Sequence, residues 1–183
     1  MISRSYWIDR ITRLWQQKSI VWLSGVRRSG KTSLCRQIPE GRYFNCDLPS
    51  VQRQLADPEA FFAQYGGEEP LLLDEVHRIR DPSLALKIAA DEFPAIRVLA
   101  TGSSTLQATR KFRDSLTDRK RVLHLTPVLW RECLGEFKQS DLDHRLLRGG
   151  LPGVLLDAAP PPGFFEDWCD SFYARDIQEL FGV

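Results

Sequence analysis

The feature that most constrains this chain is an eight-residue run near its N-terminus. Residues 25–32 read Gly-Val-Arg-Arg-Ser-Gly-Lys-Thr and match G-x-x-x-x-G-K-[ST] at every position. The run follows an apolar segment, residues 20–23, and opens a helical segment predicted over 30–38. Glycine lets the backbone turn tightly enough to point several N–H groups at one anion, and a helix N-terminus favours negative charge. The pattern therefore predicts a phosphate-binding loop between a strand and a helix.

Residue types within this loop predict individual roles. We expect Lys31 to reach the β- and γ-phosphates of a nucleoside triphosphate and the Thr32 hydroxyl to ligate Mg²⁺. The alternative is a glycine-containing surface loop that matches by chance, and its place between a strand and a helix disfavours that alternative. The residues expected to bind the nucleotide are Gly25, Arg28, Ser29, Gly30, Lys31, Thr32 and Ser33.

An acidic pair follows a second apolar run. Residues 71–73 are all leucine and lead directly into Asp74 and Glu75. This arrangement has the form of a Walker B strand, in which Asp74 would hold Mg²⁺ through its water shell. Glu75 would then polarise the water that attacks the γ-phosphate, as a general base. The alternative is an acidic strand end that is simply exposed to solvent.

A polar segment, Thr101-Gly102-Ser103-Ser104, follows the next apolar strand. A polar side chain there could sense the γ-phosphate, with Ser103 as the first candidate, ahead of Ser104. We therefore place Ser103 with Lys31 and Glu75 among the expected catalytic residues. A helix N-cap at Ser103 is an equally good interpretation, and one serine can serve both purposes.

Apolar strands alternate with helical segments over the first two thirds of the chain. This alternation predicts an α/β fold in which helices flank both faces of a mainly parallel sheet. Strands are predicted over residues 20–23, 42–46, 71–73, 97–101 and 122–125, and helices over 4–17, 30–38, 50–65 with a break at Asp57-Pro58, and from 82. Beyond Pro127 only helices are predicted, at 129–137, at 141–148 and after the prolines 160–162. We expect an ATPase core over 1–126 and a helical extension over 127–183.

Composition argues against a whole-protein attraction to nucleic acid or an anionic membrane, against a membrane span and against a disulfide framework. The net charge is +1, so no whole-protein field attracts nucleic acid or an anionic membrane. No apolar run approaches the roughly 20 residues of a membrane-spanning helix, and the N-terminus does not resemble a signal peptide. The four cysteines are far apart in sequence, which does not indicate a disulfide framework. We expect a cytoplasmic protein without membrane contact.

Basic residues are concentrated over residues 110–121. Three interpretations stay open: a solvated surface, an arginine finger that reaches a neighbouring subunit's nucleotide, and a nucleic-acid contact with little aromatic support. The residues are Arg110, Lys111, Arg113, Arg119, Lys120 and Arg121.

The ordered set of motifs resembles a known family, the AAA-type bacterial and archaeal ATP-binding proteins that carry a C-terminal domain of unknown function. Residues 25–34, 72–75, 101–104, 125–132, 148–152 and 173–177 carry the resemblance. It implies a three-layer, ASCE-type P-loop core with strand order 5-1-4-3-2, with ATP and Mg²⁺ as ligands and Glu75 as the catalytic glutamate. Asp118 stands where the family usually has glycine before Arg119. Family members continue with helical and winged-helix-like regions, so we expect this chain to be an N-terminal portion.

The leading functional hypothesis is Mg²⁺-dependent ATP binding and hydrolysis that drives a conformational change in an attached domain or partner. A homo-oligomer or a partner protein is possible, and a nucleic-acid connection would rest on family analogy alone. The chain contains no N/T-K-x-D guanine-reading motif, which favours ATP. Two alternatives are a P-loop kinase acting on a small acceptor and a nucleotide-gated binding module with little turnover.

Overall fold

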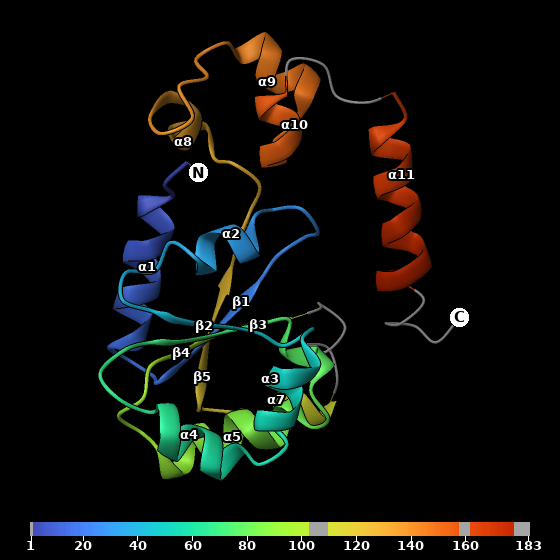
Figure 1. Ribbon diagram of the computed structural model, residues 1–183. Coiled ribbons are helices and arrows are strands. Elements are labelled where there is room, and N and C mark those ends of the chain that lie inside the picture. Colours follow the sequence, from blue (N-terminus) through green and yellow to red (C-terminus); the bar gives the residue numbers. More distant parts are fainter. Residues whose placement is uncertain (1, 103–109, 158–161, 178–183) are drawn as a thin grey trace.

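The computed structural model describes residues 2–102, 110–157 and 162–177 of the 183-residue chain. Its centre is a five-stranded sheet in the order β2-β3-β4-β1-β5, and every neighbouring pair is parallel (Figure 1). The predicted α/β class, parallel sheet and strand order are therefore confirmed. The strands are β1 (Ile20–Ser24), β2 (Arg42–Asn45), β3 (Leu71–Asp74), β4 (Val98–Thr101) and β5 (Lys120–His124).

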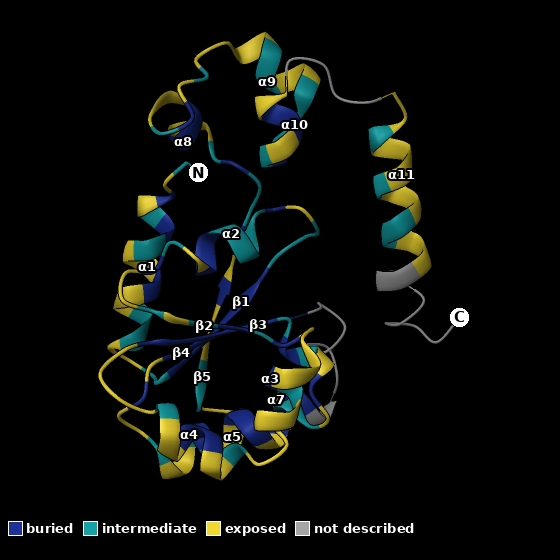
Figure 2. Ribbon diagram, in the orientation of Figure 1, coloured by how far each residue is buried: buried dark blue, intermediate teal, exposed yellow. Residues whose placement is uncertain are grey.

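The three central strands are buried along their whole length. Every residue of β1, β3 and β4 is buried, whereas the edge strands β2 and β5 are partly exposed. A strand covered on both faces needs a continuous apolar run rather than an alternating one, which explains the triple leucine of β3. Figure 2 shows the central strands in the colour of buried residues, between the two helical layers.

Helices cover both faces of the sheet, so the core has three layers. Trp22 and Leu73 pack with helices on one face, and Val21 and Leu72 pack with helices on the other. Successive strand residues point to opposite faces, so each central strand contributes to both layers. On the Trp22 face lie α3 (Pro49–Gln54), α4 (Pro58–Tyr65), α5 (Pro82–Glu92) and α7 (Arg110–Ser115), and on the Val21 face lie α1 (Ser5–Trp15) and α2 (Lys31–Cys35).

Local chemistry sets several helix boundaries. Asp57 and Asp81 cap α4 and α5 by accepting hydrogen bonds from the backbone N–H groups of Ala60 and Leu84, and a proline follows each aspartate in the first turn. This is the favoured chemistry for a helix start. The helix after the glycine-rich loop is shorter than predicted, because after Cys35 the chain continues in tight turns.

The helices after β5 form a separate group, which we call the helical extension (residues 127–177). It contains α8 (Trp130–Leu134), α9 (Leu142–Arg148), α10 (Pro152–Leu156), α11 (Phe164–Ser171) and a π-helical turn, η2 (Phe172–Ile177). Helix α10 was not predicted, because its sequence, Pro-Gly-Val-Leu-Leu, reads locally as the continuation of a turn. Its formation depends on burial of Val154 and Leu155.

The boundary at residue 126 stays a prediction. Within the described residues no helix has the length and apolar character needed to cross a membrane.

Candidate functional site

The glycine-rich loop turns sharply between β1 and α2. Gly25 has φ 150° and Gly30 has φ 95°, in the region of backbone conformation that favours glycine. A Cβ atom added to Gly25 would lie 2.5 Å from the Leu125 carbonyl oxygen and 3.2 Å from Ser29 Oγ. Gly25 is therefore needed both for its conformation and for the close approach of the segment after β5.

The interior of this loop contains a polar atom that needs a partner. Ser29 is fully buried, and within the described residues its Oγ atom has no hydrogen-bond partner. A buried hydroxyl without a partner costs about 1–3 kcal/mol. Ser29 Oγ lies 3.2 Å from the position of a Gly25 Cβ, so the hydroxyl is close to the first glycine of the loop. The loop therefore fits a ligand that supplies hydrogen-bond acceptors, such as a polyphosphate.

Lys31 folds back over the loop that precedes it. Its Nζ atom donates hydrogen bonds to the carbonyl oxygens of Gly25 at 2.8 Å and Val26 at 3.2 Å. These contacts hold the ammonium at the loop rather than in solvent. A lysine in this place can exchange carbonyl contacts for phosphate oxygens with little movement of its backbone.

The predicted acidic pair lies at the carboxyl end of β3. Asp74 is 2% exposed, and it accepts hydrogen bonds from Thr101 Oγ1 at 2.5 Å and from the Tyr43 hydroxyl at 2.7 Å. Tyr43 and Thr101 belong to the strands on either side of β3, so side chains from both neighbouring strands fix this carboxylate. Burial, and then the hydrogen bond to Asp74, raise the pKa of Tyr43 to about 12.

Glu75 is held by its backbone and by a histidine. Its N–H donates to Thr101 Oγ1 at 3.0 Å, and its φ of 55° is left-handed. Its Oε2 atom lies 3.2 Å from His77 Nδ1, although that nitrogen is not aligned for a directional hydrogen bond. The His77 contact lowers the pKa of Glu75 against the opposing effect of partial burial, and the charges of Lys31 and Arg78 add to the lowering. Glu75 is therefore a carboxylate at neutral pH.

The loop and the acidic pair share one electrostatic environment. Burial raises the pKa of the Cys35 thiol in α2, and the charges of Asp74 and Glu75 raise it further while Lys31 opposes them. All three charges are therefore close enough to act on one buried sulfur. The fold brings together two motifs that lie about 40 residues apart, as expected for parallel strands whose carboxyl ends meet at one edge.

The remaining predicted site residues are Thr32, Ser33 and Ser103. Thr32 and Ser33 lie in the first turn of α2, where the Thr32 carbonyl accepts from the Arg36 N–H and Ser33 Oγ accepts from the Gln37 amide at 3.4 Å. Ser103, together with Ser104, lies outside the described residues, so its role as a sensor stays a prediction. The roles of Thr32 and Ser33 stay predictions too.

A helix of the extension lies against the outer side of the loop. Trp168 Nε1 in α11 donates to the Arg27 carbonyl at 3.3 Å, and the Arg28 guanidinium lies 4.8 Å from the Phe164 ring centroid. Figure 1 shows the loop between β1 and α2 extending toward α11. The predicted phosphate contact Arg28 therefore stacks on an aromatic ring in this structure. From the sequence only a helix after the prolines 160–162 is predicted here, and its contact with the loop is not.

The basic stretch makes contacts within its own chain. Arg119 forms an ion pair with Asp91 of α5 at 2.6 and 3.0 Å, and Arg121 donates to Gln17. The side chains of Arg110 and Lys111 lie outside the described residues. The arginine-finger and nucleic-acid interpretations stay predictions. To act as an arginine finger, Arg119 would have to give up its ion pair with Asp91.

Among the side chains that the structure describes, no group of three or more histidine, cysteine, aspartate or glutamate residues could hold a metal ion. Mg²⁺ is usually held by one or two protein ligands together with waters and substrate phosphates. Thr32 and Asp74 are the residues that would hold it.

Comparison with known proteins gives a consistent result. A protein-family model described as an AAA domain matches residues 17–134. Uncharacterized proteins of Mycobacterium tuberculosis and Mycobacterium bovis are each 30% identical over 187 residues, a match that covers 98% of this chain and 41% of theirs. The chain thus spans about two fifths of the length of these relatives.

Solved structures with the same fold include three P-loop proteins. A Walker-type ATPase of Pyrococcus abyssi superposes with TM-score 0.58 at 15% identity and covers 85% of this chain and 66% of its own. A STAND-type signal-transduction ATPase of Pyrococcus horikoshii gives TM-score 0.57 at 15% identity over 93% and 32% of the two chains. RuvB of Thermotoga maritima gives 0.55 at 15% identity over 85% and 60%. At this identity the likeness shows the fold.

Proposed function

The chain belongs to the AAA domain family, and from that premise we propose that it binds ATP with Mg²⁺ and hydrolyses it. Lys31 and the backbone N–H groups of residues 25–32 hold the phosphates in this proposal. Thr32 and Asp74 hold the metal, and Glu75 orients the attacking water. Ser103 senses the γ-phosphate.

The observation that carries the proposal is the arrangement of Glu75. Its carboxylate follows the buried Asp74 directly, its backbone is fixed to Thr101, and its pKa is lowered. An ionised carboxylate beside a polyphosphate site can accept a hydrogen bond from water and aim its oxygen at the terminal phosphorus. An acceptor-phosphorylating enzyme does not need a water-orienting glutamate at this position.

The protein's own groups supply most of the chemistry in this mechanism. Lys31 donates to phosphate oxygens as negative charge moves onto them, and the loop N–H groups donate to the same oxygens. Asp74 is held by hydrogen bonds from Thr101 and Tyr43, so its side chain is already fixed in place before the site fills. Thr32 and Asp74 would hold Mg²⁺, whose charge would offset part of the negative charge of the phosphates.

Coupling to a conformational change is supported by the contact between the loop and α11. Because Trp168 binds the Arg27 carbonyl, a change in the loop backbone on nucleotide binding alters a contact made by the extension. The relatives are longer than this chain, and in this proposal an attached domain receives the motion. A partner protein or a second copy remains an alternative recipient, and a cytoplasmic location stays a prediction.

The test is phosphate release from MgATP with no acceptor present. We expect release by the wild-type protein, and we expect Glu75→Gln to lose about 10²-fold or more of it while retaining ATP binding. Glu69→Gln is the matched control, since Glu69 is an exposed glutamate paired with Arg42 away from the site. Release only when an acceptor is added would favour the kinase alternative. Unchanged low turnover in Glu75→Gln would favour the nucleotide-gated binding module.

A further inference from the structure

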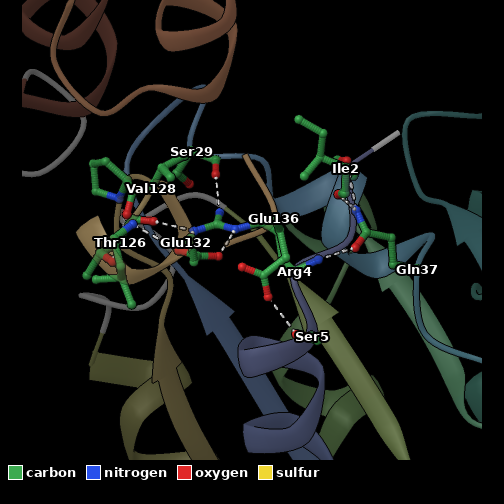
Figure 3. A network of polar contacts seen from close by, with 12 residues as sticks. Ile2, Arg4, Ser5, Ser29, Gln37, Thr126, Val128, Glu132 and Glu136 are labelled. Carbon is green, nitrogen blue, oxygen red and sulfur yellow. Dashed lines mark hydrogen bonds and ion pairs between the residues drawn. The ribbon is translucent and has the colours of Figure 1, made fainter. Parts of the chain in front are cut away.

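A buried arginine lies behind the glycine-rich loop. Arg4 is 3% exposed, and its guanidinium pairs with the carboxylate of Glu132, which is 1% exposed. The pair is bidentate: Arg4 Nε donates to Glu132 Oε1 at 2.8 Å, and Arg4 Nη2 donates to Glu132 Oε2 at 2.9 Å (Figure 3). The two residues are separated by 128 positions in sequence.

The remaining donors of Arg4 bind backbone carbonyls of two functional segments. Nη1 donates to the carbonyl of Ser29, inside the glycine-rich loop, at 2.9 Å. Nη2 donates to the carbonyl of Thr126, in the segment between β5 and α8, at 3.4 Å. One side chain therefore connects the loop, the entry to the helical extension and α8 itself.

Stability alone does not explain a group of this kind. Two charges removed from water are often no better for stability than apolar side chains of the same volume. Arg4 does more than pair with Glu132, because a planar guanidinium presents five donors in a fixed geometry. Here that geometry orients a particular peptide group of the loop.

Peptide geometry shows what the Ser29 contact does. In a trans peptide the carbonyl of one residue and the N–H of the next point in opposite directions. Holding the Ser29 carbonyl toward Arg4 therefore turns the Gly30 N–H away from Arg4. Arg4 Nη1 lies 3.8 Å from the position of a Gly30 Cβ, so the guanidinium packs directly against the back of this turn.

Glu132 is fixed from both sides. Its Oε2 atom also accepts from the Leu129 N–H at 2.9 Å, which caps the N-terminus of α8. Burial alone would raise the pKa of Glu132, but the hydrogen bonds and charge of Arg4 and the Leu129 N–H lower it. The Arg4 guanidinium thus has an ionised partner that α8 holds in place.

We infer that Arg4 is a positioning residue for the nucleotide site: it aims the Gly30 N–H at the phosphates and, through Glu132, couples the loop to α8. This inference rests on the proposed nucleotide binding. Because coupling free energies are reciprocal, a bound polyphosphate that uses the Gly30 N–H also strengthens the contact between Arg4 and the Ser29 carbonyl.

The test compares two contacts that join the same parts of the chain. Arg4→Lys and Glu132→Gln weaken the pair behind the loop. Ser5→Ala and Glu136→Gln are the matched controls, since Ser5 Oγ donates to Glu136 at 2.7 Å and neither residue contacts the loop in the described structure (Figure 3). Dissociation constants for MgATP and for tripolyphosphate are measured by calorimetry at a temperature where circular dichroism shows every variant folded.

We expect Arg4→Lys and Glu132→Gln to weaken both ligands by at least tenfold and the two controls to change them less than twofold. Equal affinity in folded Arg4→Lys and wild-type protein would overturn the inference while leaving the proposed ATPase intact. Failure of the wild type to bind MgATP would overturn the proposed function and this inference together.

A measurement on the wild type covers the case in which the Arg4 and Glu132 variants do not fold. Amide hydrogen exchange is followed at residues 129–134 of the folded protein with and without MgATP. Slower exchange in α8 when nucleotide is bound supports the coupling. Unchanged exchange there, at saturating nucleotide, contradicts it.

Discussion

The sheet with its covering helices and the helical extension are built in different ways. The side chains of Trp22, Phe61 and Leu73 are almost fully buried in the first region. The buried cluster of the second is small, consisting mainly of Val128, Cys133, Phe137 and Leu155. Leu146 and Leu147 of α9 are 73% and 82% exposed, and Figure 2 shows the extension largely in the colours of exposed and intermediate residues.

Two of the polar links between the described parts of these regions reach the proposed nucleotide site. Arg4 with Glu132 and Trp168 with the Arg27 carbonyl both contact the glycine-rich loop or the residues behind it. A region with a small core of its own takes its position from such links. If the proposed coupling holds, we expect the extension to respond to the loop with little change in the sheet.

The largest expected effect is a loss of stability in the sheet and its covering helices. Phe61 is buried and packs edge-on against Phe44 and Phe62 at centroid distances of 4.9 and 5.3 Å. Phe61→Ala leaves a cavity that the two aromatic neighbours cannot fill, and we expect it to lower the free energy of unfolding by about 3–5 kcal/mol. Urea denaturation followed by tryptophan fluorescence measures this, and a loss below about 1 kcal/mol would contradict the packing described.

The next effect concerns the glycine-rich loop, where we expect a substitution to change nucleotide affinity but not the stability of the fold. Lys31→Ala removes a charge-assisted contact worth about 1.5–3 kcal/mol, so MgATP affinity should fall roughly 10- to 150-fold. The unfolding free energy should change little, because the two carbonyl contacts of Lys31 are only partly buried. Calorimetric titration checks the affinity, with Lys87→Ala as the control, since Lys87 is an exposed lysine of α5. Retained affinity would show that the triphosphate does not bind at this loop.

A smaller effect concerns the link between the regions and depends on pH. The pKa of Glu132 is lowered from its ordinary value of 4.5 in the folded state. Its ion pair therefore contributes stability above pH 4.5 that is lost as the pH falls through the lower, folded value. Glu132→Gln lacks this titration, so its unfolding free energy should vary less than that of the wild type below pH 4.5. Parallel curves for the two proteins would show that the pair is not ionised.

The smallest effect concerns the helical extension, where an exposed leucine is compared with a buried one. Leu147→Ser changes a side chain that is mostly in solvent, and we expect a stability change within about 0.5 kcal/mol. Leu155→Ala, in the buried cluster of the extension, should cost several times more. Thermal melting of both variants gives the contrast. A large loss in Leu147→Ser would mean that this leucine is covered in solution.

The sequence was most informative where a functional or structural requirement determines several adjacent residues. The glycine-rich loop, the leucine run of β3 and the aspartate–proline helix starts can be recognised from adjacent residues, and so the sheet and its site could be placed. Contacts between neighbouring strands could not be predicted from the sequence. Tyr43 and Thr101 bind Asp74 only because β2 and β4 flank β3 in space. The strand order itself came from family resemblance.

The contacts of the extension were missed for the same physical reason. Nothing near Arg4 in the sequence indicates Glu132, and a lone arginine before a helix reads as a surface residue. Trp168 likewise has the spacing of an apolar helix face, and its hydrogen bond to Arg27 depends on the folded position of α11. Single residues that join distant segments carry no periodic signal for sequence analysis to detect.

The central claim, that the loop holds a triphosphate whose magnesium ion is shared with Asp74, has one direct test. Binding of a non-hydrolysable ATP analogue is measured by calorimetry with and without Mg²⁺, in wild-type protein and in Asp74→Asn. We expect Mg²⁺ to strengthen binding at least tenfold in the wild type and to have little effect in the variant. Equal strengthening by Mg²⁺ in both proteins would contradict the account.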